Sequence, residues 1–145
     1  MKKVKENLEH IIEICEDGSK GYETAANNVD NIELKTIFNR LSQQRKLFVE
    51  ELKNEARIQG MDLSDSGSVK GFFHRTWLST KATFSFNNEE SVIESSLTGE
   101  EKAVEVYEEN LTYEIPQNIR TMLEEQMQMI KGSIHQLNQF KSEFA

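Results

Sequence analysis

The stretch from Asn88 to Tyr113 constrains this chain most, because it combines an apolar stripe of helical spacing with a carboxylate in the middle of that stripe. At about 100° per residue, Glu100 falls on one helix face with largely apolar neighbours. That face also holds Ile93, Ser96, Leu97, Ala103, Val104, Tyr107 and Leu111. Burying an unpaired charge costs several kcal/mol. An inward Glu100 therefore needs an ion-pair partner, hydrogen bonds, a metal ion or a proton.

Composition favours helix almost throughout the chain. Its 145 residues include only one proline and seven glycines, and 29% are charged against 37% apolar. This balance suits amphipathic helices with wide solvated faces. The length fits one domain with a real core, so we expect residues 1–145 to form a single domain.

Charge and hydropathy exclude several classes of function. The formal net charge of −8 argues against binding to nucleic acid or to anionic lipid. No run approaches the roughly 18–20 apolar residues that a membrane-spanning helix needs. The N-terminal residues lack the apolar segment of a signal peptide, and Cys15 is the only cysteine. We therefore expect a cytoplasmic protein with no membrane or nucleic-acid partner.

Hydrophobic periodicity predicts four long helices. They run from about Val4 to Asn28, Ile32 to Gln59 and Asn88 to Tyr113, and onward from Pro116. Gly18 and Gly21 are unusual inside a helix, where each costs up to about 1 kcal/mol relative to alanine. They indicate either close approach of a neighbouring group or a helix break at Asp17–Gly18.

The connections between the helices predict the architecture. Short turns join helices one to two and three to four, which makes two antiparallel hairpins, whereas the crossover at about residues 60–87 is far too long for a turn. We expect a shorter fifth helix at Val69–Phe84 within it. Two hairpins joined by one long crossover form the ferritin-like arrangement of an all-α four-helix bundle.

The predicted crossover helix carries the heaviest aromatic cluster of the chain, which includes Phe72, Phe73 and Trp77. Such a cluster is usually the packing face of a helix that lies on the bundle. The alternative is an exposed interaction surface for a partner protein.

Polar residues interrupt the apolar stripes at the middle of two other helices. Gln44 and Arg45 do so in the second helix and Gln126 in the fourth. Arg45 either extends its guanidinium to solvent or is the buried counter-ion of Glu100. With Tyr22 and Tyr107 as hydrogen-bond donors, the stripes predict a buried polar network. Its members are Tyr22, Gln44, Arg45, Glu100, Tyr107 and Gln126.

A carboxylate-bridged dimetal site is the specific chemistry to test for in such a bundle. It needs a Glu from each of two helices and an inward Glu-x-x-His from each of the other two. No Glu-x-x-His occurs in this chain. We therefore expect no catalytic residue and no cofactor. The alternative is iron or manganese bound by Glu100 with nearby carboxylates, for which the candidates are Glu16, Glu23 and Glu51.

Three segments together resemble a known family. They are Asp17-Gly18-Ser19-Lys20-Gly21-Tyr22, Asp65-Ser66-Gly67-Ser68 leading to His74-Arg75-x-Trp77, and Gly99-Glu100 with Tyr107. The pattern is similar to an uncharacterised bacterial four-helix-bundle family, a domain of unknown function assigned to the ferritin-like superfamily. The resemblance implies a ferritin-like bundle with a helical crossover and a loose association with stress responses. It implies no established activity.

Three functions remain open from the sequence. The leading one is a non-enzymatic binding or scaffold protein that self-associates as a dimer or binds a protein partner. The second is a divergent metal-binding bundle built around Glu100. The third is a small hydrophobic ligand held inside the bundle near Met122, Met127 and Met129, although methionines at helical spacing usually belong to the core.

Overall fold

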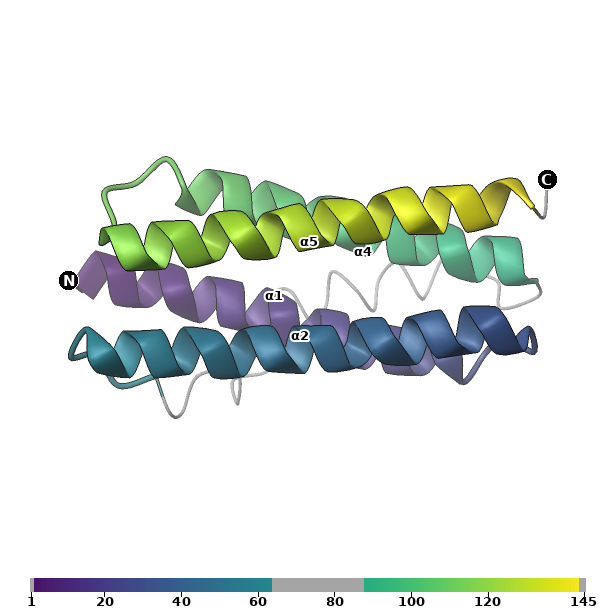
Figure 1. Cartoon of the computed structure of the whole chain (residues 1–145), viewed down its shortest axis with the longest axis horizontal. Helices are drawn as coiled ribbons and strands as arrows, with labels where there is room; N and C mark the ends of the chain where they lie inside the picture. Colours follow the sequence, from purple (N-terminus) through teal and green to yellow (C-terminus); the bar gives the residue numbers. More distant parts are fainter. Residues whose placement is uncertain (1, 64–87, 144–145) are drawn as a thin grey trace.

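The described residues form a bundle of four long helices. The structure is a computed structural model that describes residues 2–63 and 88–143 (Figure 1). The helices are α1 (Lys2–Ala26), α2 (Ile32–Ile58), α4 (Glu89–Asn110) and α5 (Gln117–Ser142). The all-helical prediction is confirmed for these residues, and the predicted boundaries differ by no more than three residues where both ends were predicted. The predicted fifth helix at 69–84 lies outside the described residues, as do Phe72, Phe73 and Trp77.

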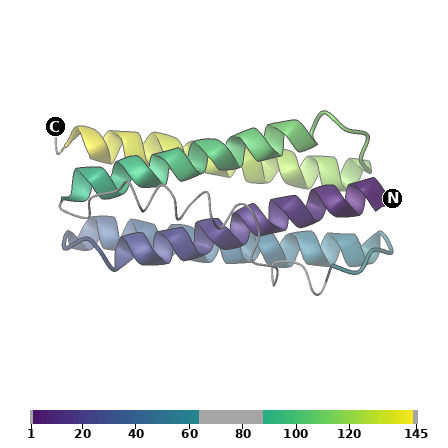
Figure 2. The ribbon, with the colours of Figure 1, turned by 180° about the vertical axis from the view of Figure 1, so that it is seen from behind.

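The helices pack at the corners of a square. Helix α1 contacts α2 and α4, and α5 contacts the same two helices, so α1 lies diagonally opposite α5. Each hairpin is antiparallel, and α2 and α4 begin at the same end of the bundle and run in the same direction (Figures 1 and 2). None of the helices in the described ranges is long and apolar enough to cross a membrane.

Local sequence signals account for the helix ends. The side chain of Asn31 accepts a hydrogen bond from the Leu34 N–H at 2.9 Å, and that of Asn88 accepts one from the Ser91 N–H at 2.8 Å. Both are N-caps that satisfy otherwise unpaired backbone donors. Helix α2 ends before Gly60, which has a positive φ of 83° that glycine adopts without strain.

The core is divided into two apolar clusters along the bundle. One surrounds Ile11, Phe48 and Leu123, and the other surrounds Phe38 and Ile93. Each of the four helices also buries small polar or charged residues in the middle part of its length. These are Ser19, Ser42, Arg45, Ser96, Glu100 and Ser133. Each helix therefore contributes to a polar layer in the interior of the bundle.

A carboxylate at the start of α4 forms hydrogen bonds with the turn between α1 and α2. Glu89 Oε1 accepts hydrogen bonds from the backbone N–H groups of Asp30 at 3.0 Å and Asn31 at 2.9 Å. These donors precede the first turn of α2, so the two hairpins are joined at this end by a charged acceptor.

We expect Glu89→Ala to lower the free energy of unfolding by about 1–2 kcal/mol, since two backbone donors lose a charged acceptor. Urea denaturation followed by circular dichroism measures the change. Glu90→Ala is the matched control, because it removes an acidic residue from the same helical turn. Equal losses in the two variants would contradict a specific role of the Glu89 contact.

Candidate functional site

A buried ion pair lies at the centre of the polar layer. Arg45 Nη1 donates to Glu100 Oε1, and Arg45 Nη2 donates to Glu100 Oε2, both at 2.5 Å. The relative exposures of the two side chains are 1% and 0%. Both carboxylate oxygens therefore meet the planar guanidinium in the bidentate geometry that favours arginine over lysine. Helices α2 and α4, which lie diagonally opposite, are thus joined through the interior.

The surroundings of Arg45 hold its side chain in place. Its Nε donates to Gln44 Oε1 at 3.2 Å, and its guanidinium carbon lies 5.5 Å from the ring centroid of Tyr22 and 5.8 Å from that of Phe48. The positive charge thus lies against two aromatic rings. A Cβ atom added at Gly18 would lie 3.4 Å from Arg45 Nη1. Gly18 therefore marks a close approach, and α1 continues through it without a break.

Arg45 keeps its charge because the neighbouring carboxylate of Glu100 compensates for the burial of the guanidinium. Burial alone would lower the pKa of Arg45, but the adjacent carboxylate of Glu100 raises it above its ordinary value. An isolated buried charge would instead be neutralised or exposed to water.

A second set of contacts crosses all four helices. The Tyr107 hydroxyl donates to Gln126 Oε1 at 2.7 Å and lies 3.2 Å from Cys15 Sγ. Since the single hydroxyl hydrogen goes to Gln126, the Cys15 thiol is the donor to Tyr107. Gln126 Nε2 then donates to Glu51 Oε1 at 3.3 Å. The chain of donors runs from α1 through α4 and α5 to the exposed edge of α2.

Burial determines the protonation states of the thiol and the phenols in and beside this series of hydrogen bonds. Burial raises the pKa of Cys15 to about 11. Burial, and then the nearby Cys15, raises the pKa of Tyr107 well above its ordinary value. Burial also raises the pKa of Tyr22, and the negative charge of Glu100 adds to that effect. The thiol and both phenols stay neutral near pH 7.

Two serines complete the contacts between α1 and α2. Ser42 Oγ donates to the backbone carbonyl of Ser19 at 2.8 Å, and the two hydroxyl oxygens lie 3.1 Å apart. Because the Ser42 hydrogen is used, Ser19 is the donor in the second bond.

The donor set does not fit a carboxylate-bridged dimetal centre. Both oxygens of Glu100 face Arg45, and a cation cannot share that position with a guanidinium. Within residues 2–63 and 88–143, no three His, Cys, Asp or Glu side chains are grouped to hold a metal ion. The exposed imidazoles of His10 and His135 lie on the outer faces of their helices.

The structure brings together only some of the residues that the stripes singled out. Gln44, Arg45 and Glu100 form one connected group, and Tyr107 and Gln126 form another. Tyr22 lies against Arg45 through its ring. Among the carboxylates considered as metal ligands, Glu16 is half-buried on α1, Glu23 is exposed on α1, and Glu51 bonds Gln126.

Sequence reasoning missed the polar contact of Cys15 with Tyr107. A signal for it exists in the spacing. Cys15 precedes Gly18 by three residues on α1, and Tyr107 follows Glu100 by seven on α4. Since α1 and α4 are antiparallel neighbours, residues before Gly18 lie level with residues after Glu100.

Fold and site together define a class of protein: a helical bundle in which an arginine–glutamate pair fills the centre. A family model described as Domain of unknown function (DUF2383) matches residues 3–113. The chain belongs to this family, since the match covers most of its length. A search among curated proteins finds no match.

We expect Glu100→Gln to destabilise the protein by about 3–5 kcal/mol, because it leaves the buried Arg45 without a counter-charge. The double variant Arg45→Met/Glu100→Leu should recover most of this loss, since it removes both charges. Urea denaturation provides the free energies. Glu101→Gln, on the exposed neighbour, should change stability by no more than about 0.5 kcal/mol. A Glu100→Gln protein as stable as Glu101→Gln would refute this reading of the pair.

Cys15 should make stability fall at alkaline pH. The unfolded thiol loses its proton near its ordinary pKa of 9.0, whereas the folded thiol keeps it until about pH 11. In that window the native state binds more protons, so its stability falls by up to about 1.4 kcal/mol per pH unit. Comparing unfolding free energies of the wild type and Cys15→Ala isolates this contribution. A constant difference between the two proteins across the window would contradict it.

Proposed function

We propose that this protein is a ferritin-like bundle without a working metal centre, and that it acts as a non-enzymatic binding or scaffold protein. The observation that carries the proposal is the bidentate contact of Arg45 with both oxygens of Glu100. A guanidinium supplies the positive charge that a metal ion would otherwise bring to an inward carboxylate, and it opens no coordination position for substrate or oxygen.

The arrangement of the helices supports the ferritin-like part of the proposal. Helices α2 and α4 begin at the same end of the bundle and run in the same direction (Figure 1). Two antiparallel hairpins arranged in this way are typical of ferritin-like folds. The inward position of Glu100 on the first helix of the second hairpin is also typical of a ligand position in such folds.

The residues around the pair support a structural role for it. Arg45, Tyr22 and Tyr107 are almost completely buried, and the two tyrosines are held neutral by burial. A site for chemistry needs an opening to substrate, whereas these groups are enclosed by apolar side chains on both sides along the bundle. Binding through the outer faces of the helices is therefore the function that this geometry favours.

Elemental analysis of protein purified without a histidine tag tests the proposal. We expect no stoichiometric iron, manganese or zinc in the wild type. Incubation with Fe(II) or Mn(II) under anaerobic conditions, followed by desalting, should leave the wild type and Glu101→Gln equally free of metal. About one or two ions per chain, lost in Glu100→Gln, would overturn the proposal in favour of a divergent metal-binding bundle.

A further inference from the structure

Helix α2 carries most of the exposed large apolar side chains of the described residues. Ile32 is 80% exposed, Leu47 56% and Ile58 68%, and the fourth such residue, Met129, lies on α5. Removing such side chains from water is favourable, so their exposure leaves apolar area that a partner could cover. Since Ile32 and Ile58 lie at opposite ends of α2, the outward side of the whole helix is involved.

The outward face of α2 carries two rows of exposed residues that recur every seven positions, and Leu47 is the only apolar residue in these rows. One row is Thr36, Gln43, Glu50 and Arg57, and the other is Glu33, Arg40, Leu47 and Asn54. The buried stripe lies on the opposite side of the same helix and includes Leu34, Phe38, Leu41, Phe48 and Leu52. Packing within the bundle covers the buried stripe, whereas the one hydrogen bond between the outward rows and another described helix runs from Arg40 Nη2 to Gln136 Oε1 of α5, at 2.6 Å.

We propose that the outward face of α2 binds a second copy of this chain, in an antiparallel, two-fold symmetric dimer. In such a dimer, a residue that precedes position 45 by some number of residues lies opposite the residue of the second copy that follows position 45 by the same number. Arg40 then lies opposite Glu50 of the second copy, and Glu33 lies opposite Arg57. Two-fold symmetry repeats both ion pairs, which gives four charge-complementary contacts along the face.

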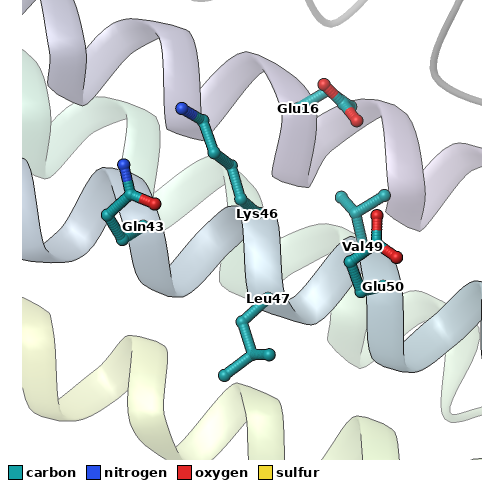
Figure 3. A pocket seen from close by; sticks show the side chains of 6 residues that line it. All are labelled: Glu16, Gln43, Lys46, Leu47, Val49 and Glu50. Atoms are coloured by element: carbon teal, nitrogen blue, oxygen red, sulfur yellow. The ribbon is translucent and has the colours of Figure 1, made fainter.

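The apolar residues follow the same register. Ile32 and Ile58 are also equally far from position 45, so each end of the dimer would bring Ile32 of one copy beside Ile58 of the other. Leu47 would lie opposite Gln43 near the symmetry axis. Gln43 and Leu47 are among the residues that line a shallow hollow of about 440 Å³ beside this position, with Glu16 contributed by α1. Leu47 points away from Glu16 and Glu50, so it lies at the edge of the hollow (Figure 3).

The charges argue against a parallel dimer on the same face. Parallel alignment would place Arg40 against Arg40, Glu50 against Glu50 and Arg57 against Arg57, and each of these like-charge pairs is unfavourable. The antiparallel register is therefore selected by electrostatics as well as by the apolar ends.

The distribution of charge also favours α2 over α4 as the interface. The chain carries a net charge of −8, which opposes association of most of its surfaces. Helix α4, with eight glutamates and one lysine, is strongly acidic. Helix α2 instead holds six basic and four acidic residues. Contact through α2 avoids the repulsion that contact through α4 would produce.

Sedimentation velocity over a wide range of wild-type concentrations, combined with charge-swap variants, tests the dimer. We expect a reversible dimer that is weakened by high salt. Arg40→Glu and Glu50→Arg should each raise the dissociation constant about tenfold or more, because each places like charges opposite one another twice. The double variant Arg40→Glu/Glu50→Arg should restore the wild-type value to within about a factor of three. Leu47→Asp should also give a monomer.

Lys131→Glu is the matched control, since it makes the same change in net charge at an exposed position of α5. It should leave the dissociation constant unchanged. Circular dichroism and thermal unfolding of each variant verify that the bundle remains folded. A monomeric wild type at all concentrations would overturn the dimer, as would a dimer insensitive to the single swaps, or a folded double swap that stays monomeric.

The proposed dimer rests on the binding role proposed above and identifies the binding partner as a second copy of this chain. The dimer and the metal-free centre can nevertheless be refuted by different results. A metal-free, monomeric wild type would overturn the dimer and leave the centre as proposed. Stoichiometric metal that is lost in Glu100→Gln, found in a dimer, would overturn the centre and leave the α2 interface.

Discussion

The contact between Arg45 and Glu100 constrains the rest of the bundle, because neither charge is tolerable in the interior without the other. The two residues lie on helices at opposite corners of the square, so the pair spans the core. Replacing the pair by well-packed apolar side chains is often neutral or favourable, whereas removing one partner is costly. The pair therefore matters more for how α2 and α4 align than for the net stability that it contributes.

The guanidinium also packs against α1. It lies against Gly18, where an added Cβ would be 3.4 Å from Arg45 Nη1, at van der Waals distance. Sliding or rotating α2 against α4 by one turn would separate the charges and leave each in apolar surroundings, at a cost of several kcal/mol. The donor chain from Cys15 to Glu51 imposes a similar condition on all four helices. Together these contacts favour one register over its alternatives.

Local patterns were enough to predict the helices, since amphipathic periodicity, the caps at Asn31 and Asn88 and the stop at Gly60 act over a few residues. The same periodicity indicated that Arg45, Glu100 and Gln126 interrupt apolar stripes. It could not indicate which polar group meets which, because that depends on the rotation and offset of helices that are distant in sequence. The choice between a solvent-directed and an ion-paired Arg45 was undecidable for this reason. The bond of Cys15 to Tyr107 was missed because a cysteine in an apolar stripe looks like any small apolar residue.

The fastening of the α1–α2 turn by Glu89 has a consequence for how the chain folds. Contacts within each hairpin join residues close in sequence, whereas the bonds from Asp30 and Asn31 to Glu89 span 59 and 58 residues. Chain entropy must be lost before such distant contacts form, so each hairpin can assemble earlier than the docking of the two. Glu89 thus belongs to the contacts that dock one hairpin onto the other, and not to those that build either hairpin.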